Sequence, residues 1–451
     1  MTSGYSVIGH PIGHTASPFI HNKLFALSKK EENYSTKDIS PEYFNDSLNT
    51  LREMSGFNVT IPHKQRIIPY LENITSVAEL SGSVNCVKIE NGKMYGTSTD
   101  GYGFLSALKI AGFPYQDISV GILGCGGAAR AISVALCENG CDVTFYCRDI
   151  NSENAKSIIC DLSKSGFEAK LKSINDYFDR HDLCVNATPV GMYPKTEDSA
   201  ITKEQLSAFK FLFDTIYNPS ETLLMKYAKE LDIKCCGGTA MLVCQAVKSH
   251  EFWYGGQFNN ENILKLIDDT NKFIEKIFTK NIKKIALCGF MGCGKTTVGK
   301  ILAEKLGFKF IDCDKYIEEN FGIPVSEIFK QYSENKFREL ETNALETLSN
   351  EENIIFALGG GAPMFPKNQE ILNNDFCTVY ISVETQNLFE RLKGDTTRPL
   401  LAGGDLYDKI KTLEESRKPT YISVSDFIID GGSTPDYVAD SIIKQLKLKE
   451  D

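Results

Sequence analysis

The stretch Gly289–Thr296, with the sequence GFMGCGKT, lies past the middle of the chain and matches the pattern G-x-x-x-x-G-K-[ST]. It follows the short apolar run Lys284–Cys288 and precedes the amphipathic run Val298–Leu306. A strand, a glycine loop and a helix in this order are the setting in which the pattern binds phosphate, because backbone N–H groups and the helix N-terminus face the phosphate oxygens. We therefore predict an α/β domain with a phosphate-binding loop over residues 285–451, preceded by a separate unit.

Two side chains of this loop add charge and metal binding to the backbone contacts. Lys295 can reach the outer phosphates of a nucleotide, and Thr296 can hold Mg²⁺. The predicted nucleotide-binding residues are Gly289, Gly292, Cys293, Gly294, Lys295, Thr296 and Thr297.

Length and composition indicate a globular protein of about three domains, since the chain has 451 residues, 42% of them hydrophobic and 24% charged. The net charge of -10 gives no electrostatic support for nucleic-acid binding. No apolar run reaches the roughly 18 residues of a membrane span. The 14 cysteines show no metal-ligand spacing, and the N-terminus shows no signal peptide, so we expect a cytoplasmic protein whose partners are small molecules. The sequence does not set the oligomeric state.

The N-terminal region begins with a predicted strand, Tyr5–Gly9, a turn-rich loop, His10–Pro18, and a predicted helix, Phe19–Phe25. Thr15 and Ser17 precede the helix N-terminus. Their hydroxyls can therefore either cap the helix or bind a carboxylate or phosphate.

Polar side chains recur further along this region, each near the end of a short apolar or β-rich segment. Lys64 follows the run that begins at Gly56, and Asn85 and Asp100 follow later segments. A single lysine is usually a solvated surface charge. Because parallel sheets bind ligands at the ends of their strands, we expect these three side chains to lie near one site.

A second glycine loop, Gly124–Ala129 (GCGGAA), has the pattern G-x-G-x-x-A. It lies between a predicted strand, Ile118–Leu123, and a predicted helix, Ala128–Asn139, and a second predicted strand, Cys141–Cys147, follows. This β–loop–α–β order predicts a dinucleotide-binding domain with a parallel sheet.

The residues after the second strand decide between NAD and NADP. An acidic residue there binds the ribose 2′-hydroxyl of NAD, whereas an arginine can bind the 2′-phosphate of NADP bidentately. This chain has Arg148 followed by Asp149. We predict NADP through Arg148, with Asp149 weakening the preference. The alternative is that Arg148 is only a solvated surface charge.

The motifs GHPIGHTASP, NVTIPHK, SVN and STDG resemble the substrate-domain signature of shikimate dehydrogenase, and the similarity covers about residues 5–270. The resemblance implies that Lys64 and Asp100 form the catalytic pair, and that NADP(H) is the cofactor. It implies substrate contacts by Thr15, Ser17, Asn58, Thr60, Asn85, Tyr217 and Gln245. It implies cofactor contacts by Gly124, Gly126, Gly127, Ala128, Ala129, Arg148, Asn186, Thr188 and Gly238. The chain departs from the family at Thr15, often serine, and at Cys147 and Asp149, where the usual pattern is Asn-Arg-Thr.

After the phosphate loop, a predicted strand, Phe308–Asp314, ends in Asp312 and Asp314, whose spacing places both carboxylates on one side of an extended strand. With this pair, the motifs FRELE (337–341), GGGA (359–362), TRPLL (397–401) and RKPTY (417–421) resemble shikimate kinase across about residues 282–446. The resemblance implies ATP and Mg²⁺ as cofactors.

Residue by residue, the resemblance to the kinase implies four roles. Asp314 orients the acceptor hydroxyl and takes its proton, and Thr296 and Asp312 hold Mg²⁺. Lys295 and Arg398 face the transferred phosphoryl group. The shikimate carboxylate and ring are held by Arg338, Gly360, Gly361 and Arg417.

The two resemblances together predict a bifunctional enzyme that reduces 3-dehydroshikimate with NADPH and then phosphorylates shikimate. The predicted substrate-binding domain comprises residues 1–105 and 238–278, the dinucleotide domain 106–237, a connector 279–284 and the kinase domain 285–451. Two alternatives are a catabolic NAD-linked quinate/shikimate dehydrogenase fused to a kinase, and a non-catalytic metabolite sensor with these folds. Retention of Lys64, Asp100, Lys295 and Asp314 argues against the sensor.

Overall fold

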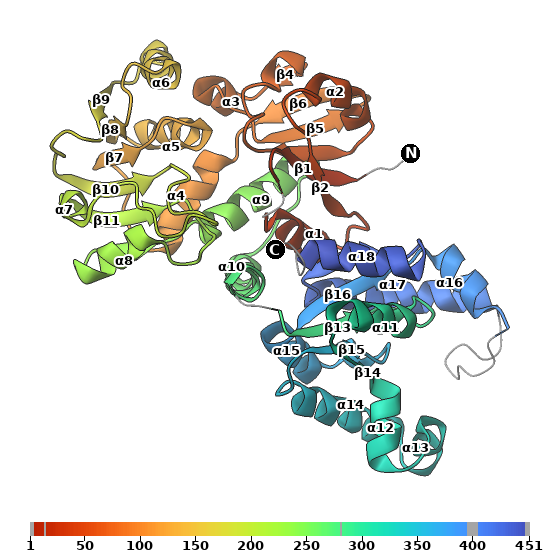
Figure 1. Cartoon of the computed structure of the whole chain (residues 1–451). Helices are drawn as coiled ribbons and strands as arrows, with labels where there is room; N and C mark the ends of the chain where they lie inside the picture. Colours follow the sequence, from red (N-terminus) through yellow and green to blue (C-terminus); the bar gives the residue numbers. More distant parts are fainter. Residues whose placement is uncertain (1–3, 13–14, 280–281, 395–404, 447–451) are drawn as a thin grey trace. The chain divides into compact units, whose positions relative to one another are not determined.

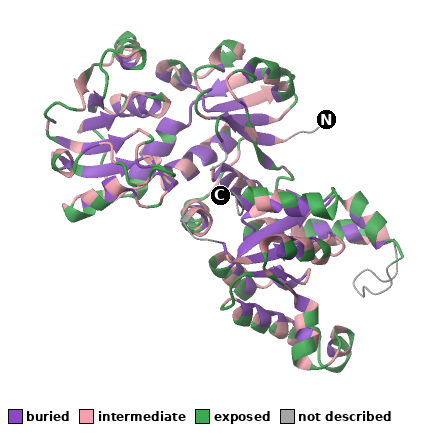
Figure 2. Ribbon diagram, viewed as in Figure 1, coloured by how far each residue is buried: buried purple, intermediate pink, exposed green. Residues whose placement is uncertain are grey.

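The computed structural model describes residues 4–12, 15–279, 282–394 and 405–446 (Figure 1). The chain divides into two compact units, Met1–Phe278 and Thr279–Asp451. The first unit contains two sheets, each the centre of one lobe, and the second unit contains one sheet. The strands at the centre of each sheet are buried, and the helices covering them carry the exposed residues (Figure 2).

The first lobe is built on a mixed sheet in which β5 runs antiparallel to its neighbours. Ile8, Phe57 and Val87 lie in its core, and α2 covers one face. The strands, in spatial order, are β2 (Tyr34–Asp38), β1 (Tyr5–Gly9), β3 (Gly56–Val59), β5 (Cys86–Glu90), β6 (Lys93–Thr97) and β4 (Asn73–Ile74). The helices of this part of the chain are α1 (Ser17–Leu27), α2 (Phe44–Arg52) and α3 (Ser76–Ser81).

The second lobe has a fully parallel sheet in the spatial order of a dinucleotide-binding fold. Its strands are β12 (Lys234–Cys236), β11 (Phe209–Asp214), β10 (His181–Asn186), β7 (Ser119–Leu123), β8 (Asp142–Cys147) and β9 (Ala169–Ser173). Its helices are α5 (Gly127–Cys137), α6 (Glu153–Lys164), α7 (Lys203–Leu206) and α8 (Leu223–Glu230). The strand order reverses between β7 and β10, which is where such sheets bind ligands.

Two helices, α4 (Asp100–Ile110) and α9 (Thr239–Tyr254), pack against each other between the sheets of the first unit (Figure 1). Two glycines of α4 allow its neighbours to approach closely, Gly103 toward α9 and Gly101 toward α5. A Cβ atom added at Gly103 would lie 2.7 Å from the carbonyl oxygen of Met241, and one at Gly101 would lie 2.7 Å from that of Ala131. The helix α10 (Asn260–Ile274) completes this unit.

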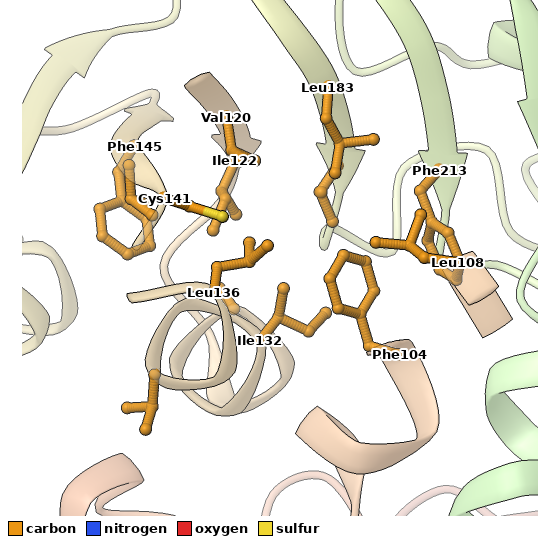
Figure 3. Packing of buried hydrophobic residues seen from close by; sticks show 14 of the residues in the cluster. Phe104, Leu108, Val120, Ile122, Ile132, Leu136, Cys141, Phe145, Leu183 and Phe213 are labelled. Carbon is orange, nitrogen blue, oxygen red and sulfur yellow. The ribbon is translucent and has the colours of Figure 1, made fainter. Parts of the chain in front are cut away.

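The other side of α4 closes the core of the second lobe. Phe104 meets the ring of Phe213 on β11 with centroids 4.8 Å apart. Figure 3 shows Phe104 and Leu108 of α4 beside Ile132 and Leu136 of α5, below the strands of the parallel sheet. The helix that begins with Asp100 is therefore fixed to both lobes.

The second unit is a parallel sheet covered by helices, as the phosphate loop predicts. Its strands, in spatial order, are β14 (Lys309–Asp312), β15 (Ile354–Ala357), β13 (Lys284–Cys288), β16 (Cys377–Ser382) and β17 (Phe427–Asp430). Its helices are α11 (Lys295–Leu306), α12 (Cys313–Phe321), α13 (Val325–Gln331), α14 (Glu334–Leu348), α15 (Pro366–Asp375), α16 (Thr385–Leu392), α17 (Leu406–Val424) and α18 (Pro435–Leu446). The predicted α/β class is confirmed.

Two local predictions are wrong. The strand predicted over Phe308–Asp314 ends at Asp312, whose side chain caps α12, so Asp314 lies in the first turn of that helix. Asn85 does not follow a strand but precedes β5. Because β5 runs antiparallel to β3, its start lies at the edge where β3 ends, and Asn85 still reaches the expected edge of the sheet.

Candidate active sites

Lys64 and Asp100 form an ion pair at the edge of the first sheet. Lys64 Nζ donates to Asp100 Oδ2 at 2.6 Å, and the two side chains are only 15% and 8% exposed. A Cβ atom added at Gly127 would lie 3.4 Å from Lys64 Cδ, so the lysine stem borders the start of α5. A paired ammonium therefore lies beside the predicted dinucleotide loop.

Asn85 connects this pair to α9. Its Nδ2 donates to Asp100 Oδ1 at 2.8 Å and to Gln245 Oε1 at 3.2 Å, and its Oδ1 accepts from the backbone N–H of Thr99 at 2.7 Å. Both oxygens of Asp100 thus have donors, and the carboxylate is held in one orientation. The structure brings Lys64, Asn85, Asp100 and Gln245 together, as the sequence predicted.

Asn58 is buried beneath these residues and is fully hydrogen-bonded within the protein. Its Oδ1 accepts from the hydroxyl of Tyr34 at 2.7 Å, and its Nδ2 donates to the carbonyl oxygen of Asn85 and to Ser249 Oγ, both at 3.0 Å. Asn58 therefore fixes the backbone of Asn85. Thr60 follows the end of β3 and is partly buried.

Thr15, Ser17 and Tyr217 form a group of neutral hydroxyls. Thr15 Oγ1 donates to Ser17 Oγ at 3.0 Å and accepts from the backbone N–H of Ser17 at 3.1 Å. Burial raises the pKa of Tyr217, while its hydrogen bonds to Thr15 and to the backbone at Ala16 lower it. A neutral phenol beside two hydroxyls can donate hydrogen bonds to a carboxylate.

The loop after β7 has the features that a dinucleotide pyrophosphate requires. Gly124 has a φ of +95°, which favours glycine, and a Cβ atom there would lie 2.8 Å from Thr188 Cγ2. An added Cβ at Gly126 would meet no atom within 4 Å, so the loop is open on that side. Among the described residues, no side chain caps the N-terminus of α5, which begins at Gly127 and includes Ala128 and Ala129. These observations fit a bound pyrophosphate.

Arg148 is exposed directly after β8. Asp149, the residue that could favour NAD, turns its carboxylate into its own loop, where Oδ1 accepts from the backbone N–H of Asn151 at 2.9 Å. Because the carboxylate of Asp149 is hydrogen-bonded within its own loop, Arg148 is the charged side chain that this loop exposes to a ligand. The arrangement fits a 2′-phosphate better than a 2′-hydroxyl.

Asn186, the last residue of β10, is held by the buried carboxylate of Asp214 and in turn holds Thr188. Asn186 Nδ2 donates to Asp214 Oδ1 at 3.0 Å, and Asn186 Oδ1 accepts from the hydroxyl of Thr188 at 2.7 Å. Thr222 Oγ1 donates to Asp214 Oδ2 at 2.7 Å. Burial raises the pKa of Asp214 to about 6 despite these donors. The network ties the two loops after β10 and β11 together.

Gly238 lies at the start of α9, near the same group of loops. A Cβ atom added there would lie 2.1 Å from the carbonyl oxygen of Thr215. Only glycine permits this approach.

The loop after β13 and the first turn of α11 contain the residues predicted to bind nucleotide phosphates: Gly289, Gly292, Cys293, Gly294, Lys295, Thr296 and Thr297. Lys295 Nζ donates to the carbonyl oxygens of Gly289 and Phe290 at 2.8 and 3.0 Å. Thr296 Oγ1 donates to Asp312 Oδ2 at 2.8 Å. A hydroxyl and a carboxylate in contact at this loop are suited to Mg²⁺, and the lysine lies within the loop that it would help to close around phosphates.

Arg338 on α14 lies against the glycine turn after β15. A Cβ atom added at Gly361 would lie 2.7 Å from Arg338 Nη1, which itself donates to Glu341 Oε2 at 2.7 Å. Among the described residues, the buried Nε of Arg338 has no hydrogen-bond partner. A buried, unsatisfied guanidinium N–H fits an anionic ligand.

Three more groups surround this turn. Arg417 Nη1 and the hydroxyl of Tyr421 donate to the carbonyl oxygen of Gly360 at 3.3 and 2.6 Å. Burial raises the pKa of Glu341 to about 7, Arg338 opposes the shift, and Asp314 adds to it. The structure thus brings Asp314, Arg338 and Arg417 together around one turn. The predicted residue Arg398 lies outside the described residues.

Several residues of these sites were not singled out in the sequence, although all of them except Asp214 lie in a quoted motif. Thr99 donates to Gln245 Oε1 at 3.2 Å, and Asp214, Glu341 and Tyr421 hold loops or arginines. The signal that could have identified them is a polar residue at a position expected to be buried, close to a predicted site residue. Within the described residues, no cluster of three or more His, Cys, Asp or Glu could hold a metal ion. None of the described helices combines the length and the apolar character that crossing a membrane requires.

The fold and sites define a class of protein: a two-lobed, dinucleotide-dependent oxidoreductase followed by a P-loop phosphotransferase. Residues 7–87 match the family model described as Shikimate dehydrogenase substrate binding domain, and residues 291–447 match Shikimate kinase. The chain belongs to the shikimate dehydrogenase family through its first unit, and it is a fusion with a shikimate kinase domain.

Relatives support this assignment. The Shikimate dehydrogenase (NADP(+)) of Caldanaerobacter subterraneus is 35% identical over 273 residues, which are 59% of this chain and 96% of that protein. A chorismate mutase/shikimate 5-dehydrogenase fusion from Clostridium acetobutylicum has a TM-score of 0.56 at 31% identity, covering 61% of this chain and 99% of that one. The Thermus thermophilus enzyme in complex with NADP(H) and shikimate has a TM-score of 0.54 at 27% identity, covering 60% and 100%.

Proposed function

We propose that the chain is a bifunctional enzyme of the shikimate pathway, which reduces 3-dehydroshikimate to shikimate with NADPH and phosphorylates shikimate with MgATP. The observation that carries the proposal is the Lys64–Asp100 ion pair against the start of α5. An ammonium group beside the dinucleotide loop supports a proton donor there, in a chain that also carries a complete phosphate loop.

In the reduction, the nicotinamide supplies the hydride, and the protein supplies a proton to the ketone oxygen. Lys64 donates this proton, and Asp100 holds the ammonium group at 2.6 Å. Asn85, which is itself bonded to Gln245, keeps Asp100 in place. Asn85, Gln245 and Thr60 bind substrate hydroxyls. The hydroxyls of Thr15, Ser17 and Tyr217 bind the substrate carboxylate. Asn58 acts by positioning Asn85.

In the phosphorylation, ATP supplies the phosphoryl group, and the protein positions both partners and offsets their charge. Asp314 accepts the proton of the attacking hydroxyl. Arg338 and Arg417 hold the shikimate carboxylate beside Gly360 and Gly361. Lys295 and Arg398 neutralise the transferred group, and Thr296 and Asp312 hold Mg²⁺.

We place the enzyme in the cytoplasm, with small molecules as its partners. All 14 cysteines are free thiols, which supports a reducing compartment.

The test is to incubate the full-length protein with 3-dehydroshikimate, NADPH, ATP and Mg²⁺ and to identify the products by chromatography. Shikimate should accumulate without ATP, and shikimate 3-phosphate should form when ATP is added. Preference for NADH would show that Asp149 rather than Arg148 selects the cofactor. Failure to convert added shikimate would exclude the kinase activity.

A further inference from the structure

Tyr34 is the one buried residue of β2, the edge strand of the first sheet, and its side chain ends on a polar group. Its hydroxyl donates to Asn58 Oδ1 at 2.7 Å, and the two residues are only 3% and 6% exposed. Burial raises the pKa of Tyr34 well above its usual value, so the phenol keeps the proton that it donates. A tyrosine of the edge strand therefore holds the buried amide of Asn58.

The orientation of the Asn58 amide is fixed by its other two partners. Its Nδ2 donates to the carbonyl oxygen of Asn85 and to Ser249 Oγ, both at 3.0 Å. Ser249 Oγ donates its own proton to the carbonyl oxygen of Gln245 at 3.0 Å, so it can only accept from Asn58. A turned amide would place Oδ1 against the carbonyl oxygen of Asn85, with two acceptors in contact. Asn58 Oδ1 must therefore face Tyr34, which among the described residues is its only donor.

Tyr34 is itself fixed to α1. The side chain of Asn22 accepts from the backbone N–H of Tyr34 at 2.9 Å and donates to the carbonyl oxygen of Tyr34 at 3.2 Å. The ring of His21 stacks on the ring of Tyr34, with centroids 4.0 Å apart and an interplanar angle of 3°. The same helix begins with Ser17, whose hydroxyl binds the substrate carboxylate in the proposed function. These contacts to α1 use the backbone and the ring of Tyr34, and they leave its hydroxyl for Asn58.

A continuous path of hydrogen bonds leads from Tyr34 to the ammonium group of Lys64. Asn58, which Tyr34 holds, donates to the carbonyl oxygen of Asn85. Asn85 Nδ2 donates to Asp100 Oδ1 at 2.8 Å, and Asp100 Oδ2 accepts from Lys64 Nζ at 2.6 Å. Every residue of the path before Lys64 is buried, and a buried polar group that loses its partner is costly. One phenol hydroxyl thus links α1 to the Lys64–Asp100 pair.

We propose that Tyr34 is a positioning residue for the reduction: through the amide of Asn58, its hydroxyl keeps the Lys64–Asp100 pair in register with the hydroxyls at the start of α1. This role rests on the proposed function of the first unit. A substrate held by its carboxylate at α1 must present its ketone oxygen to Lys64, and a misplacement of about 1 Å can cost roughly 10²-fold in rate. The register that Tyr34 sets therefore acts on the proton-transfer step rather than on cofactor binding.

The test compares Tyr34→Phe with the wild type, both as full-length protein, in the steady-state reduction of 3-dehydroshikimate by NADPH. The variant keeps the ring, its stacking on His21 and the backbone bonds to Asn22, but it leaves Asn58 Oδ1 buried without a donor. We expect kcat to fall roughly 10- to 100-fold, the effect usual for a group that orients a reacting one. KM for NADPH and the rate of shikimate phosphorylation should stay at their wild-type values, which also shows that the variant is folded.

Two further readouts separate positioning from a general loss of stability. Proton transfer from Lys64 should limit the rate in Tyr34→Phe, so the ratio of kcat in H₂O to kcat in D₂O should rise above that of the wild type. In an Asn58→Ala background, Tyr34→Phe should have no further effect on kcat, because the phenol acts through that amide. Ser249→Ala removes another partner of the same amide, from α9, and should also lower kcat.

Tyr146→Phe is the matched control. It removes the hydroxyl of another buried tyrosine of the first unit, which lies 2.9 Å from His181 Nε2, and should leave kcat and the isotope effect unchanged. Wild-type kcat in Tyr34→Phe would overturn the proposal, as would a full additional loss when Tyr34→Phe is combined with Asn58→Ala. If Tyr34→Phe does not fold, unchanged kcat in Ser249→Ala would overturn it. A wild-type protein that reduces no 3-dehydroshikimate would overturn the proposed function itself.

Discussion

The two glycine loops of this chain, Gly124–Ala129 and Gly289–Thr296, share their setting and differ in their charged side chains. Each follows a buried parallel strand and leads into a helix whose N-terminus, among the described residues, has no side-chain cap. The second loop brings Lys295 and the hydroxyl of Thr296, which we propose to hold Mg²⁺. The first has small side chains, and its cation, Arg148, comes from the next strand.

The difference follows from what happens to the phosphate. A dinucleotide pyrophosphate is held but not transferred, so N–H groups and a helix N-terminus suffice. A phosphoryl group in transfer needs cations placed on it. The placement of charge, rather than the glycine pattern, therefore separates a cofactor site from a transfer site. Four changes test this comparison.

The largest effect is expected at the transfer loop. Lys295→Ala should lower phosphorylation of shikimate by roughly 10³-fold or more, the effect typical of a cation at the transferred group. Reduction of 3-dehydroshikimate should continue, and shikimate should accumulate. Lys300→Ala, at an exposed position of the same helix, is the control and should behave as the wild type. Phosphorylation within tenfold of the wild type would remove Lys295 from the transfer step.

The second change addresses the proton donor beside the cofactor loop. Lys64→Ala should lower the rate of reduction by roughly 10²–10⁴-fold, the usual contribution of general acid catalysis, and should leave the kinase unaffected. Lys93→Ala removes a lysine that is 55% exposed and paired with Glu72, and should change neither rate. A rate of reduction near that of the wild type would exclude Lys64 as the proton donor.

The third change tests Arg148, the cation beside the cofactor loop, as the residue that distinguishes NADPH from NADH. A charged hydrogen bond contributes about 1.5–3 kcal/mol, so Arg148→Ala should lower the preference for NADPH over NADH by about 10- to 150-fold. The measurement is kcat/KM with each cofactor. Arg180→Ala, at an exposed position before β10, should leave the preference intact. Equal loss of kcat/KM for both cofactors would contradict a role in reading the 2′-phosphate.

The smallest effect concerns the buried network beside the cofactor loop. The pKa of Asp214 is raised from 3.8 to about 6. Between about pH 4 and pH 6, Asp214 therefore keeps its proton in the folded chain and loses it in the unfolded chain. The contribution of Asp214 to the stability of the folded chain is full below about pH 4 and is lost as the pH rises through 6. Asp214→Asn removes the titration, so its stability relative to the wild type should rise by up to about 3 kcal/mol between pH 4 and pH 7.

Urea unfolding followed by tryptophan fluorescence measures this effect, because the chain has one tryptophan, the buried Trp253 of the first unit. Thr222→Val removes a hydrogen-bond donor to the carboxylate of Asp214 and should raise the pKa of Asp214 further. Stability curves of Asp214→Asn and wild type that stay parallel across this pH range would show that the carboxyl does not titrate as the structure indicates.

Local patterns predicted the parts of these sites that depend on local geometry. Both glycine loops could be read from a strand, glycines and a helix within about 20 residues. The orientation of Asn85 could not, because it depends on β5 pairing antiparallel with a strand 27 residues away. Asp314 was misplaced because the cap formed by Asp312 competes with continuation of the strand. Asp214 acquires its role only through burial beside Asn186, 28 residues away.

The close contact between α4 and its neighbours has a consequence for mutational tolerance. Four successive residues begin this helix: Asp100, Gly101, Tyr102 and Gly103. Any side chain at either glycine would collide with backbone of α5 or α9, whereas Tyr102 is 46% exposed. Every single-nucleotide change that replaces a glycine introduces a side chain. Natural variation can therefore enter this segment only at Tyr102, and a saturation library should show one permissive codon flanked by restrictive ones.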